Sequence, residues 1–303
     1  MHSRWKATVA SAAAVVTAAL PVGVRSTAQA APPACPSLYV VAVPGTWETS
    51  DKDPGKGMLA SVTNNLPGNV RTDYVNYAAT AFPWEGDVYG RSKQEAVNRT
   101  RGMIGAMAQR CGATRFALLG YSQGADAAGD VAASIGTGLG VVPANRVSLV
   151  GLIADPRRSP TDQLIGPPVP GAGASGPRVG GFGWVGPRTY TFCAAGDLYC
   201  SMPNGDFAGR IGGLLVQLSN PDPAQLGTYQ QEVSTLLNDA LAAGGVGLLN
   251  NQITNAEYNQ RKKQIDDFLK SGIHQSYPRY GVDPSGATAL TWLHQRLIAA
   301  AQG

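Results

Sequence analysis

Over its first two thirds, the chain alternates between short hydrophobic runs and segments with helical spacing of apolar residues. Continuous apolar runs at 38–43, 116–119 and 147–154 predict strands that are buried on both faces. An alternating run at 70–77 predicts another strand, and residues 189–193 predict a short last one. Strands separated by helices predict a three-layer α/β fold with a five-stranded, mainly parallel sheet.

Two helices are predicted between these strands. In the first, Ser92 to Glu95 matches a capping box, and the apolar residues behind it recur at helical spacing as far as Cys111. The second begins at Ser122 and is rich in Gly and Ala, which allows close packing against the sheet. Residues 157–187 are rich in Pro and Gly, so we expect a surface loop without regular structure there.

The stretch from 205 to 272 has helical periodicity and no strand pattern. An apolar stripe from Leu226 to Leu241 predicts one helix, and a second helix ends at Gly272. We interpret residues 205–272 as a helical insertion that is either a lid or groove wall for the active site, or a decoration packed on the sheet. A terminal helix is predicted over 284–301.

Residues 1–30 have the pattern of a secretory signal peptide. A basic start and an uncharged, Ala- and Val-rich run precede the small-x-small sequence Ala28-Gln29-Ala30. A retained N-terminal membrane anchor is the alternative, but the apolar run is short for a span and is broken by Pro21. Residues 31–303 are then expected to form a single domain.

Composition narrows the classes of function. The 44% hydrophobic content is ample for a sizeable core. The formal net charge of +4 falls to +1 without residues 1–30, so we expect no nucleic-acid partner. All 4 cysteines follow that segment, and in an exported protein they predict disulfides with three alternative pairings. No Cys or His cluster has zinc spacing, so no metal site and no cofactor are expected.

The sequence Gly-Tyr-Ser-Gln-Gly at 120–124 fits the turn that carries the nucleophile in α/β-hydrolases, with Ser122 as that nucleophile. The pattern alone is weak because the chain has 38 Gly. A serine hydroxyl also needs a base, and the candidates after residue 30 are His274 and His294. His274 follows a helix end, in a loop where an imidazole can be aimed, whereas His294 adjoins the apolar stripe of the terminal helix, so we favour His274.

The acid of such a site holds the tautomer of the histidine and lies between the nucleophile and the histidine in the chain. Asp197 satisfies this order and follows the strand two places after the strand of Ser122. Asp155 is the alternative acid, with a turn or cap before Pro156 as its structural role.

Two donors to an oxyanion are predicted near the nucleophile. One is the backbone N–H of Gln123, at the start of the helix that follows Ser122. The other is Thr46, in the loop after the first strand, which offers an amide and a hydroxyl but is equally consistent with an ordinary turn residue.

With these residues considered together, the chain resembles the cutinase family of serine esterases. The matching segments are GYSQGA at 120–125, the loop that joins Cys193, Asp197 and Cys200, His274, and the GT-x-E loop at 45–48. The resemblance covers about residues 35–200 and the segment around His274.

The resemblance implies a small α/β-hydrolase-type fold with a five-stranded parallel sheet. It implies that Ser122 is the nucleophile, Asp197 the acid and His274 the base, with Thr46 and Gln123 at the oxyanion. It also implies the disulfides Cys35–Cys111 and Cys193–Cys200.

The chain departs from simple cutinases in the long path from the acid to the histidine. Residues 205–272 and the loop at 157–187 resemble the cutinase-like envelope lipases of mycolic-acid-producing actinobacteria, which act on lipids as phospholipases, esterases or thioesterases. We therefore expect an exported serine hydrolase, secreted or held in the cell envelope or at a membrane surface, that cleaves acyl esters of lipids through an acyl-enzyme.

Two other functions are compatible with the same residues. A thioesterase or an acyltransferase of cell-envelope lipid (mycolate) metabolism would use the same triad with a different acceptor. A non-catalytic envelope-binding protein with this fold is disfavoured, because the serine, acid and histidine are all present and in the expected order.

Overall fold

The computed structural model describes residues 34–302, with gaps at 50, 51, 53–56, 204, 205, 222, 224, 225, 244 and 246–253. The predicted signal peptide at 1–30 lies outside the described residues. From Cys35 onward the chain forms one compact unit. No helix within these described ranges combines the length and the apolar character that crossing a bilayer requires.

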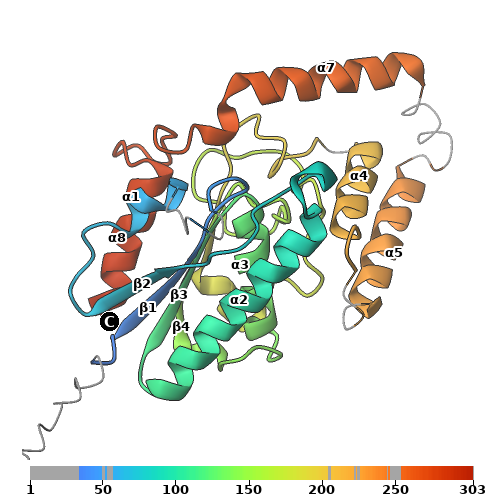
Figure 1. Ribbon diagram of the computed structural model, residues 1–303. Helices are drawn as coiled ribbons and strands as arrows, with labels where there is room; N and C mark the ends of the chain where they lie inside the picture. Colours follow the sequence, from blue (N-terminus) through green and yellow to red (C-terminus); the bar gives the residue numbers. More distant parts are fainter. Residues whose placement is uncertain are drawn as a thin grey trace, which may run out of the picture. The chain divides into compact units, whose positions relative to one another are not determined.

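The core of this unit is a five-stranded sheet in which all neighbouring strands are parallel, in the order β2-β1-β3-β4-β5 (Figure 1). This confirms the predicted fold class. The strands are β1 (Leu38–Val43), β2 (Val70–Tyr74), β3 (Arg115–Tyr121), β4 (Val147–Ile153) and β5 (Thr189–Phe192). In the register of the sheet, Tyr121 at the end of β3 faces Ile153 of β4, and Ile153 faces Phe192 of β5, so the loops after these strands emerge together.

Helices cover both faces of the sheet, and β1 shows why. Its Tyr39, Val41 and Val43 pack in one hydrophobic cluster with α2 (Tyr89–Arg110) and α3 (Gln123–Gly136). Its alternate residues Leu38, Val40 and Ala42 pack in a second cluster with α1 (Ala60–Thr63) and α8 (Ala289–Gln302). A strand with both faces covered carries apolar residues at every position, as the sequence of β1 does.

The sequence predicted that α2 begins at a capping box formed by Ser92 and Glu95, and this prediction was wrong. The helix begins at Tyr89, and its N-cap Val88 makes no side-chain cap hydrogen bond. Ser92 is instead buried inside the helix, where its hydroxyl accepts a 3.1 Å hydrogen bond from the Thr80 amide. Tertiary contacts therefore use Ser92, although its spacing to Glu95 also fits a capping box.

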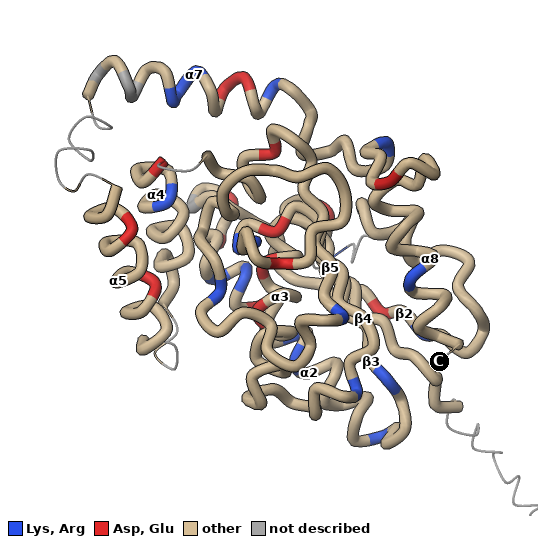
Figure 2. The backbone as a smooth tube through the Cα atoms, turned by 180° about the vertical axis from the view of Figure 1, so that it is seen from behind, with Lys and Arg blue, Asp and Glu red and all other residues tan. Residues whose placement is uncertain are grey.

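The stretch 205–272 contains three helices in its described part: α4 (Phe207–Gln217), α5 (Leu226–Ala242) and α7 (Asn255–Ser271). α4 and α5 share a small hydrophobic cluster built on Phe207, Leu214, Leu236 and Ala240. Along α7, acidic and basic residues alternate (Figure 2), and the pairs Lys262–Asp266 and Lys263–Asp267 are spaced i,i+4 on its exposed surface.

The segment 157–187 is more ordered than its Pro- and Gly-rich composition predicts. A 3₁₀ helix covers Gly183–Arg188. Isolated bridges join Leu164 to Thr191 and Ala172 to Met202. The expectation of a loop without regular structure was therefore wrong in part, because backbone pairing to β5 and to the chain after it orders the segment.

Both expected disulfides are present, Cys35–Cys111 and Cys193–Cys200. The first joins the start of β1 to the end of α2, and the second closes the loop after β5. Disulfides are typical of proteins in oxidising compartments.

Candidate active site

Ser122 lies on a sharp turn between β3 and α3. Its backbone has φ 54° and ψ −123°, a conformation that is rare for a residue other than glycine. Its amide donates a 2.9 Å hydrogen bond to Ile153 O. The flanking glycines are required by close approach, because a Cβ at Gly120 would lie 2.4 Å from Gly124 O, and one at Gly124 would lie 2.1 Å from Val43 O. The turn thus presents Ser122 as the nucleophile elbow of α/β-hydrolases does.

His274 reaches this serine from the chain after α7. Gly272, with φ 66°, ends that helix, and His274 follows in a short 3₁₀ turn. Its Nε2 lies 2.9 Å from Ser122 Oγ, and its Nδ1 lies 2.8 Å from Asp197 Oδ2. The imidazole packs between two rings, with centroid distances of 5.2 Å to Tyr121 and 4.5 Å to Tyr199.

Asp197 is fully buried in the loop that the Cys193–Cys200 disulfide closes. Its Oδ1 accepts a 3.0 Å hydrogen bond from the Tyr199 amide, and its own amide donates to Ala194 O at 2.9 Å. The Tyr199 amide therefore holds the carboxylate through Oδ1, the Ala194 carbonyl holds the backbone, and Oδ2 faces the imidazole. The structure brings Ser122, His274 and Asp197 into one hydrogen-bonded row.

Tyr277 belongs to this site and was not found from the sequence. Its buried hydroxyl donates to Asp197 Oδ2 at 2.7 Å and accepts from the Ala194 amide at 3.1 Å. Burial raises the pKa of Tyr277 well above its ordinary value, so the hydroxyl stays protonated and can donate. In the sequence, the only hint of this role was that a tyrosine stands three residues after His274.

Tyr121, the residue before Ser122, also supports His274. Its hydroxyl donates a 2.7 Å hydrogen bond to His274 O. Burial raises the pKa of Tyr121, so this donor too stays protonated. Tyr121 therefore anchors the backbone of His274, the residue whose imidazole faces Ser122.

The two alternative residues lie elsewhere. The Asp155 carboxylate pairs with Arg178, with Oδ2 2.6 Å from Nη1, and its Oδ1 accepts from the Arg157 amide. His294, on α8, has its Nδ1 3.0 Å from Val62 O. The structure does not bring either of them to Ser122.

The expected oxyanion residues lie on two neighbouring segments. Gln123 is the first residue of α3, and the Gly45 position is so close to β3 that a Cβ there would lie 2.7 Å from the Tyr121 ring. Among the described residues, neither the Gln123 amide nor the Thr46 amide donates a hydrogen bond to another backbone group. An amide at a helix start, as at Gln123, and one in a neighbouring turn, as at Thr46, suit a negatively charged oxygen when no backbone acceptor occupies them.

Glu48 shapes the loop that carries Thr46. Its carboxylate accepts hydrogen bonds from the Gly45 amide at 2.8 Å and from the Met58 amide at 2.7 Å. Burial raises the pKa of Glu48 above its ordinary value. The GT-x-E pattern thus forms a closed turn, and its glutamate accepts hydrogen bonds from backbone amides.

A cluster of buried charges involves Asp126 and Asp130 of α3. Lys93 lies 2.9 Å from Asp126 and 2.8 Å from Asp130, and Arg178 lies 2.9 Å from Asp130. Burial raises the pKa of Asp130, but Lys93, Arg157 and Arg178 outweigh it and leave that pKa well below the ordinary value. Arg178 thus forms ion pairs with both Asp130 and Asp155, and we interpret these pairs as structural.

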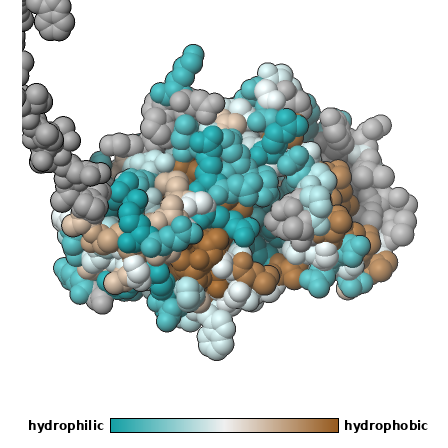
Figure 3. Space-filling view, turned by 60° about the horizontal axis from the view of Figure 1, so that its bottom comes forward, coloured by the Kyte–Doolittle hydropathy of each residue, from teal (hydrophilic) through white to brown (hydrophobic). Residues whose placement is uncertain are grey.

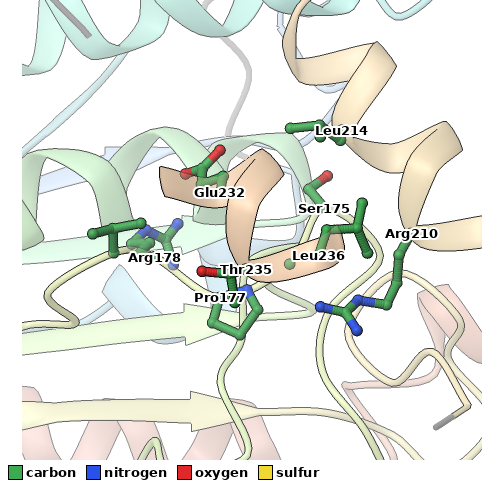
Figure 4. A pocket seen from close by; sticks show the side chains of 10 residues that line it. Ser175, Pro177, Arg178, Arg210, Leu214, Glu232, Thr235 and Leu236 are labelled. Atoms are coloured by element: carbon green, nitrogen blue, oxygen red, sulfur yellow. The ribbon is translucent and has the colours of Figure 1, made fainter. Parts of the chain in front are cut away.

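The helical insertion is bound to this cluster. Gln217 of α4 accepts a 2.6 Å hydrogen bond from Lys93 Nζ and donates to Asp126, and Glu232 of α5 pairs with Arg157. Glu232 and Arg178 also line a cavity of about 210 Å³ between residues 175–179 and the two helices (Figure 4).

Within the described ranges, no group of three or more His, Cys, Asp or Glu side chains is arranged to hold a metal ion. The polar groups around Ser122 instead form hydrogen bonds with one another, as in the serine hydrolase arrangement of nucleophile, base and acid.

Comparisons with known proteins place the chain in a family. The family model of cutinase matches residues 34–209. A "Carboxylesterase Culp6 homolog" of Corynebacterium glutamicum is 33% identical over 208 residues, which are 56% of this chain and 66% of the relative.

Two solved structures are similar at low sequence identity. The catalytic core of acetyl xylan esterase from Trichoderma reesei is 19% identical, with 66% of this chain and 99% of that chain covered and a TM-score of 0.46. Lysin B from Mycobacteriophage D29 is 21% identical, with 67% and 89% covered and a TM-score of 0.46. Because the family model spans more than half of the residues, the chain belongs to the cutinase family, a family of carboxylic ester hydrolases.

Proposed function

We propose that the protein is an exported serine esterase that hydrolyses acyl esters of lipids, with Ser122 as nucleophile, His274 as base and Asp197 as acid. The observation that carries the proposal is the unbroken row from Ser122 Oγ to His274 Nε2 (2.9 Å) and from His274 Nδ1 to Asp197 Oδ2 (2.8 Å). Membership of the cutinase family and the carboxylesterase relative support the ester bond as the target.

The reaction follows from this geometry. His274 Nε2 takes the proton of Ser122 Oγ as the oxygen attacks the ester carbonyl carbon, and Asp197 stabilises the imidazolium that forms. The amides of Gln123 and Thr46 donate to the oxyanion of the tetrahedral intermediate. His274 then protonates the departing alcohol, which leaves an acyl-Ser122 ester. A water molecule, deprotonated by His274, releases the carboxylic acid and restores Ser122.

A lipid substrate is supported by apolar residues exposed near the site and on the insertion. Trp47, next to Thr46, is 67% exposed. Hydrophobic residues also gather on the side of the molecule that carries α5 (Figure 3), where Leu237 and Leu241 are exposed. Exposed apolar surface of this kind is typical of proteins that act on lipid or other apolar partners.

Export is supported by the signal-peptide pattern of residues 1–30 and by the two disulfides. A covering role for the last helix of the insertion is supported by Phe268 of α7, whose ring centroid lies 5.5 Å from that of Tyr199 and 6.4 Å from that of His274. We propose that α7 borders the substrate next to the base.

A fluorophosphonate probe tests the proposed chemistry, because it reacts with an activated serine. We expect a single adduct on Ser122, identified by peptide mass spectrometry, and no adduct on Ser122→Ala. An adduct on another residue, or none, would remove the proposed nucleophile. Product analysis with added alcohol or thiol acceptors then separates hydrolysis, which ignores the acceptor, from acyl transfer.

A further inference from the structure

Trp47 has a backbone conformation that its residue type disfavours. It is the third residue of the turn at residues 45–48, which a 3.1 Å hydrogen bond from the Glu48 amide to Gly45 O closes. Its φ is 64°, in the left-handed region. Turns with a positive φ at the third position usually place glycine or asparagine there, and a bulky side chain in that conformation is a true outlier.

Hydrogen bonds hold Trp47 in this conformation from both ends of the residue. Its amide donates to Ala79 O at 2.8 Å, and its indole Nε1 donates to Glu85 Oε1 at 2.7 Å. The other oxygen of Glu85 accepts from the amides of Ala81 and Phe82 at 2.8 and 2.9 Å. The turn and the loop at 81–85 are therefore fastened together through the indole.

Burial does not account for a tryptophan at this position, because the residue is 67% exposed. Its ring is instead the first of three neighbouring aromatic rings, Trp47, Phe82 and Trp84, which we call the row. The Trp47 and Phe82 centroids are 6.3 Å apart, and Phe82 stacks on Trp84 at 4.6 Å with the ring planes 4° apart. Phe82 and Trp84 are 41% and 80% exposed, so the row presents its rings to solvent.

This row starts at the residue after the expected oxyanion donor Thr46. We propose that Trp47 is a specificity-determining residue whose indole contacts the acyl chain of the bound ester, with Phe82 and Trp84 continuing the contact. The proposal rests on the proposed esterase function. A methylene chain suits these rings, because Glu85, a charged side chain that bonds to the row, is already engaged by Trp47 and by two amides. Backbone strain kept at an exposed residue points to a use for its side chain.

The test compares Trp47→Gly and Trp47→Ala with the wild type on p-nitrophenyl acetate and p-nitrophenyl octanoate. Glycine accepts the left-handed conformation, so Trp47→Gly removes the ring and also relieves the strain, whereas Trp47→Ala removes the ring and keeps the strain. We expect both variants to lose about tenfold or more in kcat/KM on octanoate, mainly through KM, and less than about twofold on acetate. The melting temperature of Trp47→Gly should exceed that of Trp47→Ala.

Trp184→Ala is the matched control, because Trp184 is 81% exposed and precedes β5, at the amino edge of the sheet. It should leave both substrates unaffected. An equal loss on acetate and octanoate, or no loss on either, would overturn the proposal.

Failure of this inference differs from failure of the proposed function. If Ser122→Ala abolishes turnover of both esters while Trp47→Gly affects them equally, the esterase stands and the role of Trp47 falls. If wild-type turnover does not depend on Ser122, the esterase itself falls.

Discussion

The Tyr277 hydroxyl donates a 2.7 Å hydrogen bond to Asp197 Oδ2, the same carboxylate oxygen that lies 2.8 Å from His274 Nδ1. Both donors bond to Oδ2, and the disulfide-closed loop holds Oδ1 through the Tyr199 amide. Asp197 is therefore fixed before any substrate binds, which is the condition for orienting an imidazole without reorganisation.

Tyr277→Phe should weaken this support without removing the triad. The change deletes one donor to Asp197 and leaves the buried Ala194 amide without its acceptor. We expect kcat to fall about tenfold, equivalent to about 1.4 kcal/mol, and the free energy of unfolding to fall by about 1–2 kcal/mol. Hydrolysis of p-nitrophenyl butyrate and urea unfolding measure the two effects. Tyr190→Phe, on β5, is the control and should match the wild type; an unchanged kcat in Tyr277→Phe would contradict the argument.

Asp197→Asn and Asp155→Asn should separate catalysis from stability. The Asp197→Asn variant would hold the imidazole in the wrong tautomer, so its kcat should drop by about 10⁴ at near-wild-type stability. The Asp155→Asn variant would remove one of the ion pairs of the buried Arg178, which keeps Asp130, and lower the free energy of unfolding by about 1–3 kcal/mol, while kcat per folded molecule stays within about threefold. The far-UV ellipticity gives the folded fraction of each variant, and the reverse pattern would make Asp155 the acid.

Reduction of the Cys193–Cys200 disulfide should reduce activity before it unfolds the core. The loop carries Asp197, whereas the sheet has two hydrophobic clusters of its own. In a titration with reductant, we expect ester hydrolysis to fall at concentrations that leave the far-UV ellipticity unchanged. Cys193→Ala/Cys200→Ala, which lacks this bridge only, should start at the reduced activity. Parallel loss of both signals would mean that the bridge holds the whole fold.

Asp130→Asn should make the protein less stable at neutral pH, and the loss of stability should become smaller in acid. Because the folded pKa of Asp130 is lowered, its contribution is complete above the unfolded pKa of about 3.9 and is lost as the pH falls below that value toward the folded pKa. We expect a deficit of about 3–5 kcal/mol at pH 7 that narrows below about pH 4. Urea unfolding at pH 7, 5 and 3 measures it, and a deficit independent of pH would assign the effect to packing alone.

The sequence predicted features that are local in the chain or repeat with a regular period. The strands, the glycines around Ser122 and the order of Ser122, Asp197 and His274 are of this kind, and the fold and the family followed from them. The catalytic roles of Ser122, Asp197 and His274 stay predictions that the experiments above test. Asp155 could be ranked below Asp197 from order alone, but its pairing with Arg178 became visible only in three dimensions.

Features that depend on distant contacts could not be predicted. Lys93 and Gln217 are 124 positions apart, and no periodicity links them. In the sequence, Tyr277 is an ordinary aromatic residue, because its partner Asp197 lies 80 positions away in the chain. The start of α2 was misplaced for the same reason, because Ser92 bonds to Thr80 in another segment and not to its own helix end.

The hydrogen bonds of Gln217 have a consequence for shortening this chain to a minimal esterase. Excising α4 would strip a partner from Lys93 and Asp126 in the protein interior, and excising α5 would strip Glu232 from Arg157. Deletions that remove those helices would need compensating apolar replacements at each stranded charge. α7 carries the pairs Lys262–Asp266 and Lys263–Asp267 on its exposed surface, but its Arg261 also pairs at 2.9 Å with Asp206, the N-cap of α4. Shortening α7 would therefore leave one more charge without its partner, and the new connection would still have to position the imidazole of His274.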